Sequence, residues 1–227
     1  MEIMFDNVNL ATLEESAAIY PYVGVTSNPT IIKEEGKIDF AKHFNKVREI
    51  IGNEKSLHIQ VVSTTEEEII AEAHTIAELV DKNVYIKIPV TEEGLKAIKK
   101  LKAEGFKITA TAIYTRIQGL LAIAAGADYI APYFNRIEAC GEEDPCNVIA
   151  CLRKDIDFTN AKTKILAASF HRGEQVLKAL ASGADAVTLQ PRLLKEMISR
   201  DYITNAVNTF ASDWENTQGC KNILGIK

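Results

Sequence analysis

Short apolar runs alternate with longer segments of helical periodicity along the chain. Eight runs are rich in branched residues and bounded by turn-forming residues, which is typical of strands buried on both faces. They cover residues 3–6, 23–28, 57–62, 84–90, 107–113, 129–133, 164–169 and 186–190. Helical spacing occupies the segments between them, for example 9–19, 40–51, 66–80, 92–103 and 173–181. This alternation predicts a closed parallel (β/α)8 barrel of the TIM-barrel class.

The barrel pattern accounts for most of the 227 residues, so a single domain over 1–227 is expected. The pattern shows no linker, internal repeat or low-complexity segment. Near the end of the chain, Val207, Phe210 and Trp214 recur at helical spacing. They predict an extra C-terminal helix over about residues 203–216, whose apolar side needs a packing partner.

The fourth predicted strand carries a lysine, Lys87, in the middle of the apolar run Val84–Val90. Burial disfavours the ammonium form and lowers the pKa of a lysine, which makes the amine a nucleophile for carbonyl groups. A lysine in such a strand can also extend to water or pair with a carboxylate. The strand alone leaves both interpretations open.

Polar residues recur near the C-terminal end of every predicted strand. Inward-facing side chains at that end of a barrel surround one common mouth, where barrel enzymes build their active sites. Each residue alone has a structural explanation as a turn former, strand threonine or core aromatic, but the complete set favours a catalytic Lys87. The set is Asp6, Asn28, Gln60, Lys87, Thr111, Tyr133, Ser169 and Gln190.

A buried amine suits chemistry on a ketone. The amine condenses with the carbonyl to an iminium, which accepts electrons when the neighbouring carbon–carbon bond breaks in a reversible aldol step. Asp6, Tyr133 and Gln60 are available for proton transfer and for holding water. This chemistry needs neither a metal ion nor an organic cofactor, so none is expected.

The segment after the seventh strand is suited to an anion. Ser169 and Arg172 flank the start of the next helix, where backbone N–H groups and the helix dipole favour a phosphate. Arg136, three residues beyond Tyr133, could close over the same anion with two hydrogen bonds. Both arginines could equally be solvated surface charges.

Composition narrows the function classes. The net charge of −5 and a pI near 5.5 argue against nucleic acid as a partner. The start of the chain lacks a signal-like pattern, and no apolar stretch approaches a membrane span, so a cytoplasmic protein without membrane contact is expected. The four cysteines lack the spacing of paired zinc ligands and are expected to be reduced thiols.

Several motifs together resemble the transaldolase superfamily, in its small-barrel branch of fructose 6-phosphate aldolases. They are FDN, VTSNPTII, IQVV, VYIKIPVTEEGLKAI, ITATAIYTRIQGLLAIAAGADYIAPYFNRI, KILAASFHR and DWENTQG. The resemblance implies a (β/α)8 barrel and a Schiff base on Lys87, with Asp6 handling protons. It also implies that Asn28 and Thr111 line the dihydroxyacetone end of the site.

The same resemblance implies that Arg136 and Ser169 bind the substrate phosphate. It assigns glutamine and tyrosine at Gln60 and Tyr133 to aldolases, where transaldolases carry glutamate and phenylalanine. The expected activity is therefore a class I aldolase that reversibly cleaves fructose 6-phosphate, or a similar ketose, into dihydroxyacetone and glyceraldehyde 3-phosphate. The alternative is a transaldolase that transfers dihydroxyacetone units between sugar phosphates.

The chain departs from the family pattern at one place. His171 stands where a basic residue is expected, with Arg172 following, so phosphate affinity could be weak or pH-dependent and the acceptor could lack phosphate. A non-catalytic barrel that only binds a sugar phosphate is a further alternative. The resemblance also implies a homo-oligomer, a pentamer or decamer, in which the C-terminal helix reaches a neighbouring subunit.

Overall fold

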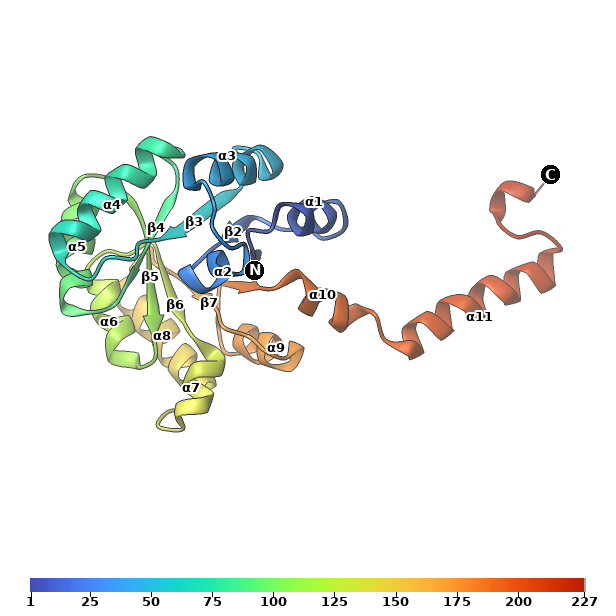
Figure 1. Cartoon of the computed structure of the whole chain (residues 1–227). Coiled ribbons are helices and arrows are strands. Elements are labelled where there is room, and N and C mark those ends of the chain that lie inside the picture. Colours follow the sequence, from blue (N-terminus) through green and yellow to red (C-terminus); the bar gives the residue numbers. More distant parts are fainter. Residues whose placement is uncertain (227) are drawn as a thin grey trace. The chain divides into compact units, whose positions relative to one another are not determined.

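Eight parallel strands close into a barrel in a computed structural model that describes residues 1–226. Each strand pairs with its neighbours in chain order, and β1 closes the ring by pairing with β8. Figure 1 shows the strands at the centre with the helices around them. The predicted (β/α)8 fold is confirmed. The strands are β1 (Glu2–Asp6), β2 (Gly24–Thr26), β3 (Ser56–Gln60), β4 (Tyr85–Pro89), β5 (Lys107–Ile113), β6 (Tyr129–Pro132), β7 (Lys164–Ala167) and β8 (Ala186–Leu189).

Two short helices within residues 1–226, α2 and α7, were not predicted from the hydrophobic periodicity. Both are too short to show a helical repeat in the sequence. The helices α3, α5 and α9 have the predicted bounds. The helices are α1 (Leu10–Ile19), α2 (Pro29–Glu34), α3 (Phe40–Ile51), α4 (Glu66–Leu79), α5 (Glu92–Ala103), α6 (Arg116–Ala124), α7 (Phe134–Cys140), α8 (Pro145–Thr159), α9 (Gly173–Ala181), α10 (Pro191–Ile198) and α11 (Asp201–Gln218).

The turn after β4 shows how the sequence places a helix directly behind the lysine strand. The Thr91 hydroxyl accepts a hydrogen bond from the backbone N–H of Gly94 and so caps α5. A Cβ atom on Gly94 would lie 2.0 Å from the carbonyl oxygen of Pro89. Glycine therefore allows α5 to begin in contact with the end of β4.

An aromatic layer fills the barrel on the N-terminal side of Lys87. His58 stacks on Tyr85 with ring centroids 4.4 Å apart, and Tyr129 meets both rings edge-on. Burial and then the nearby Lys87 hold the pKa of His58 well below its usual value, so this histidine is neutral. His58 is thus a packed core residue rather than a residue of the mouth.

The contacts divide the chain into two units, residues 1–191 and the residues from Arg192 onward. The first unit is the barrel. In the second unit, the predicted C-terminal helix is observed as α11, and none of its side chains is buried. Ile203, Val207 and Phe210 of this helix are all exposed.

The structure reveals a repeat that the sequence pattern did not indicate. The unit formed by β5 and α6 and the unit formed by β7 and α9 share a left-handed residue at or just after the strand end, Ala112 (φ 55°) and Ser169 (φ 63°). Each helix carries a glutamine at its third position, and each is followed by Gly-Ala-Asp. Asp128 and Asp185 each accept a hydrogen bond from the backbone N–H of the second residue of the preceding strand.

Candidate active site

Lys87 lies at the centre of β4 and only 3% of it is exposed. Its strand neighbours in register are Gln60 on β3 and Thr109 on β5. Within residues 1–226, no carboxylate lies within ion-pair distance of its amine. Burial lowers the pKa of Lys87, and the negative charge of Asp6 opposes this only in part. The side chain therefore neither reaches water nor forms an ion pair, and its amine loses a proton more easily than that of an ordinary lysine.

Asp6 stands at the end of β1 and accepts a hydrogen bond from the Thr26 hydroxyl, which in turn contacts Thr188. Thr26 Oγ1 donates to Asp6 Oδ1 at 2.6 Å, and the hydroxyls of Thr26 and Thr188 are also 2.6 Å apart. Since the single hydrogen of Thr26 points to the carboxylate, Thr188 must donate to Thr26. Burial raises the pKa of Asp6, while Lys87 and the Thr26 hydrogen bond act in the opposite direction. Burial thus makes this carboxyl more ready to take up a proton than an ordinary aspartate, which suits a group that transfers protons.

Tyr133 follows β6 as the N-cap of α7, one residue beyond the strand in which it was expected. Its phenol oxygen accepts a hydrogen bond of 3.0 Å from Thr111 Oγ1. Burial raises the pKa of Tyr133, so the phenol stays protonated well above neutral pH. Because the oxygen accepts from Thr111, the phenol proton remains available to a reacting atom.

Gln60 has an unsatisfied oxygen. Its Oε1 atom is buried and finds no hydrogen-bond partner among the described residues. A buried amide oxygen without a donor is costly, and a bound water or a substrate hydroxyl would satisfy it. Gln60 also lines a largely apolar hollow of about 510 Å3, together with Pro29, Ile32, Phe40 and Val62 among others.

The Asn28 side chain caps a helix through its oxygen and leaves its nitrogen free among the described residues. Its Oδ1 atom accepts from the backbone N–H groups of Thr30 and Ile31, at 2.9 and 3.0 Å, and so caps α2. Pro29 occupies the first turn of α2, where its missing N–H costs nothing. The Nδ2 group donates to none of residues 1–226, so two donors remain available for substrate hydroxyls.

The groups expected to bind phosphate differ in their availability. Arg136 is exposed and makes no hydrogen bond or ion pair within the described part of the chain, and the half-buried Ser169 likewise offers its hydroxyl. Arg172, in contrast, pairs with Glu138 at 2.9 Å. The backbone N–H groups of His171 and Arg172 both donate to Gln175 Oε1. Free backbone N–H groups were expected here, and these two are already occupied.

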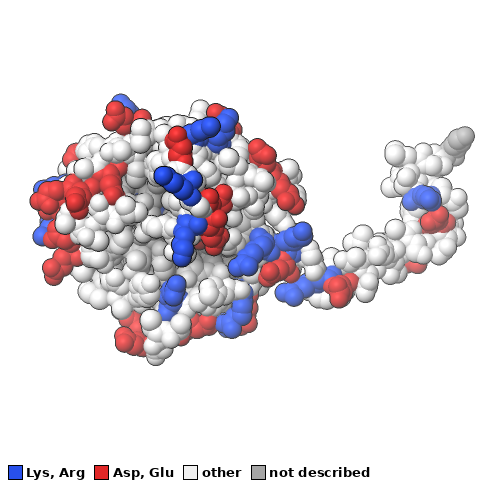
Figure 2. All heavy atoms as spheres, in the orientation of Figure 1, with Lys and Arg blue, Asp and Glu red and all other residues white. Residues whose placement is uncertain are grey.

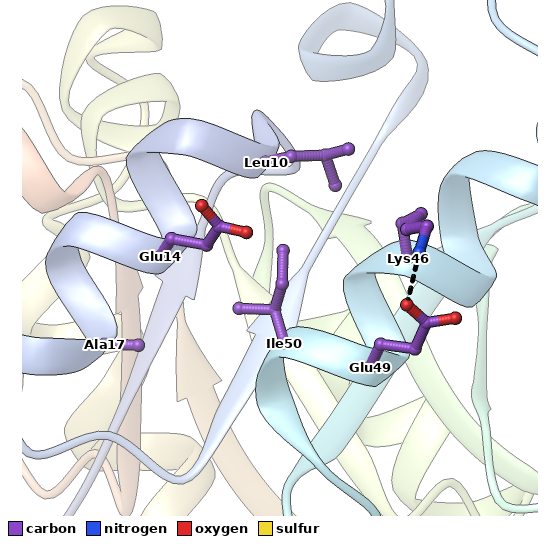
Figure 3. A pocket seen from close by; sticks show the side chains of 6 residues that line it. All are labelled: Leu10, Glu14, Ala17, Lys46, Glu49 and Ile50. Atoms are coloured by element: carbon purple, nitrogen blue, oxygen red, sulfur yellow. Dashed lines mark hydrogen bonds and ion pairs between the residues drawn. The ribbon is translucent and has the colours of Figure 1, made fainter.

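A surface groove of the barrel unit contains none of the candidate catalytic residues. A groove of about 450 Å3 lies between α1 and α3. Its lining residues are Leu10, Glu14 and Ala17 on α1 and Lys46, Glu49 and Ile50 on α3 (Figure 3). None of the strand-end residues described above lines it. Basic and acidic side chains are interspersed on the face of the barrel in Figure 2, so anion binding there would depend on local groups.

Two kinds of feature are absent from residues 1–226. These residues contain no group of three or more histidine, cysteine, aspartate or glutamate side chains placed to hold a metal ion. None of their helices has the length and apolar character that a membrane crossing requires.

Comparison with known proteins places the chain in a family. The sequence model described as "Transaldolase/Fructose-6-phosphate aldolase" matches residues 3–221. The chain belongs to this family. A protein of Streptococcus pneumoniae (strain ATCC 700669 / Spain 23F-1) named "Probable fructose-6-phosphate aldolase" is 48% identical over 223 residues, which cover 98% of this chain and 100% of that protein. The resemblance drawn from the motifs is confirmed.

The structure places Asp6, Gln60, Lys87 and Thr111 on β1, β3, β4 and β5, and Tyr133 directly after β6. Gln60 pairs in register with Lys87, the charge of Asp6 acts on the Lys87 amine, and Thr111 binds the Tyr133 phenol. The sequence reasoning assigned no role to Thr26, Thr188, Gln175 or Glu138. Strand alternation does place Thr26 and Thr188 on inward faces, so that signal was present. Nothing comparable marks Glu138, because its contact depends on how α7 and α9 are turned toward each other.

Proposed function

We propose that this protein is a class I aldolase that reversibly cleaves fructose 6-phosphate, or a similar ketose, into dihydroxyacetone and glyceraldehyde 3-phosphate. The observation that carries the proposal is the buried, unpaired Lys87 on β4, beside the strand β5 whose Thr111 holds the protonated Tyr133 phenol. Family membership and the name of the pneumococcal relative support it.

The chemistry begins at the amine. Neutral Lys87 Nζ adds to the C2 carbonyl of the ketose, and loss of water gives an iminium. A base takes the proton of the C4 hydroxyl, the C3–C4 bond breaks, and its electron pair moves into the iminium to give an enamine. The aldehyde then leaves. Asp6 is suited to proton transfer in these steps because burial raises its pKa.

Tyr133 completes the aldolase cycle. Its phenol proton adds to C3 of the enamine, which regenerates an iminium, and water adding at C2 releases dihydroxyacetone and the free amine. Thr111 orients the phenol, and the vacant Gln60 oxygen can hold the attacking water together with the Thr111 hydroxyl. A phenylalanine at position 133 would leave the enamine waiting for an aldehyde, which is transaldolase chemistry.

The first experiment measures free dihydroxyacetone released from fructose 6-phosphate, with and without erythrose 4-phosphate, using protein treated with a chelator. The proposal expects release without an acceptor. Turnover only with erythrose 4-phosphate would assign a transaldolase. Tyr133→Phe should lower acceptor-free release by about 100-fold, because one proton donor is lost.

Borohydride reduction in the presence of substrate tests the nucleophile. Wild-type protein should be trapped as a covalent adduct, and Lys87→Ala should show none. Lys99→Ala, which changes an exposed lysine on α5, serves as the matched control and should be trapped like the wild type. Trapping at another lysine in the Lys87 variant would contradict the assignment, and tight sugar-phosphate binding without any adduct would indicate a binding protein.

We also propose a homo-oligomer, a pentamer or decamer, working in the cytoplasm. The exposed apolar residues of α11, Val207 and Phe210 among them, support a partner for this helix in a second copy. The four cysteines are free thiols, as is usual in a reducing compartment. Light scattering of purified protein would test the assembly, and a monomer would exclude it.

A further inference from the structure

Two arginines near the end of β7 are in different electrostatic situations. Arg136, in the first turn of α7, has no partner among residues 1–226. Arg172, the N-cap of α9, pairs through Nη2 with Glu138 Oε2 at 2.9 Å. Glu138 belongs to α7, so one short helix presents both a free guanidinium and the carboxylate that neutralises the other one.

Glu138 is held more firmly than an ordinary surface carboxylate. Its Oε2 atom also accepts a hydrogen bond of 2.6 Å from Gln175 Nε2. Gln175 is only 1% exposed, and its remaining groups bind Asn135 Oδ1 and the backbone N–H groups of His171 and Arg172. The buried amide therefore fixes the position of the carboxylate beside Arg172.

This arrangement opposes a second anion at Arg172. A phosphate that approaches the guanidinium meets the negative charge of Glu138, and it must share the guanidinium with a carboxylate already in place. The two backbone N–H groups that would otherwise favour the phosphate are occupied by Gln175. Arg136 and Ser169 remain as the groups without competing partners.

We propose that Glu138 is a specificity-determining residue of the aldehyde end of the site: by holding Arg172 in an ion pair, it lowers the preference for phosphorylated over unphosphorylated aldehydes. The inference rests on the aldolase function proposed above. It assigns Glu138 no part in the bond-breaking steps.

The test compares two acceptors in the direction of synthesis. Dihydroxyacetone is supplied with glyceraldehyde 3-phosphate or with glyceraldehyde, and the ratio of the two kcat/KM values is measured. Glu138→Gln keeps an oxygen that can accept from Gln175 and removes the charge. This variant should raise the ratio about tenfold, mainly through a lower KM for the phosphorylated aldehyde, since one charge-assisted contact is released for the phosphate.

Two further variants separate a local effect from a general one. In the double variant Glu138→Gln with Arg172→Gln, the gain should disappear, because the released guanidinium is what produces it. Glu142→Gln removes one negative charge from an exposed residue just beyond α7 and should leave the ratio as in the wild type. An unchanged ratio in Glu138→Gln, or the same rise in Glu142→Gln, would overturn the proposal.

Calorimetric titration with inorganic phosphate gives a readout that does not need turnover. Glu138→Gln should bind phosphate about tenfold more tightly than the wild type, and the double variant should not. If no variant joins the substrates but phosphate binding follows this order, the aldolase function fails and the role of Glu138 in anion selection stands. If the wild type is an active aldolase and neither phosphate affinity nor the ratio changes, only the present inference fails.

Discussion

The β5–α6 and β7–α9 units follow one backbone plan but use it differently. In both, a glutamine at the third helical position accepts from two backbone N–H groups of the preceding loop. The Nε2 group of Gln118 then donates to the backbone carbonyls of Val90 and Ala112. The Nε2 group of Gln175 donates instead to side chains, those of Asn135 and Glu138.

The two glutamines show how the same backbone arrangement can either fix a strand end or position nearby side chains. A glutamine that bonds to backbone carbonyls fixes the end of β5, and it does so whatever side chains surround it. A glutamine that bonds to side chains makes the identity of those side chains matter, so substitutions on α7 can change the proposed aldehyde end of the site. The strand ends differ likewise, since Thr111 on β5 contacts the Tyr133 phenol and the matching position near the end of β7 is Ala168.

The largest expected effect concerns this contrast at the strand ends. Thr111→Val removes the hydrogen bond to the Tyr133 phenol and the hydroxyl proposed to hold water, so kcat should fall by about 100-fold. The hydrogen bond from Thr111 lowers the phenol pKa, so its loss should also raise the pKa of Tyr133. The basic limb of the pH–kcat profile should therefore move to higher pH.

Thr111→Ser is the matched control for this prediction. It keeps the hydroxyl and should restore most of the rate together with the original basic limb. If Thr111→Val lowered the rate without moving that limb, the threonine would act through packing rather than through the phenol.

A second prediction tests whether Asp128 and Asp185 stabilise the β5–α6 and β7–α9 units equally. Asp128 binds Lys102 and the Ile108 N–H group, and Asp185 binds Arg153 and the Ile165 N–H group. Each change to alanine should lower the free energy of unfolding by about 2 kcal/mol, because a charge-assisted bond to a backbone N–H group is lost.

Urea denaturation of the two variants measures both losses under one condition. Similar losses of unfolding free energy would show that the two aspartates stabilise the fold equally. A clear loss in one variant and none in the other would show that the shared geometry does not carry shared energetics.

The smallest effect is expected at the two left-handed residues. Ala112→Gly and Ser169→Gly should each raise the free energy of unfolding by about 1 kcal/mol, because glycine adopts positive φ without strain. Only Ser169→Gly removes a hydroxyl proposed to bind phosphate, and it should raise the KM for fructose 6-phosphate about tenfold. Thermal melts measure the change in stability, and steady-state kinetics measure the KM. A raised KM in Ala112→Gly as well would show that the effect of Ser169→Gly does not come from the lost hydroxyl.

Much of the fold was predictable because period and burial act locally. The eight buried runs and the helices between them were recognisable, and strand alternation placed Lys87, Thr111 and Asp6 on inward faces. The short helices α2 and α7 were missed. The pair Asn28-Pro29 is typical of a strand end, but it also provides the N-cap and the first-turn proline of α2.

Part of the site was also beyond prediction, for a different reason. The pairing of Glu138 with Arg172 joins two helices, and it depends on the rotation of each helix and on a buried glutamine between them. Periodicity shows which side of a helix is apolar but not which exposed charges of two helices meet. Few identical residues mark the repeat of β5–α6 in β7–α9, so it is visible mainly in the matching hydrogen bonds to the glutamine oxygens and to Asp128 and Asp185.

The placement of the single tryptophan has a practical consequence. Trp214 is the only tryptophan in the chain and lies in α11, whereas six of the seven tyrosines belong to the barrel unit. Fluorescence excited selectively through the indole will therefore report on the C-terminal helix and its surroundings, while tyrosine absorbance reports on the barrel. Two optical signals can thus follow the two units of one unlabelled protein separately during dilution or denaturation.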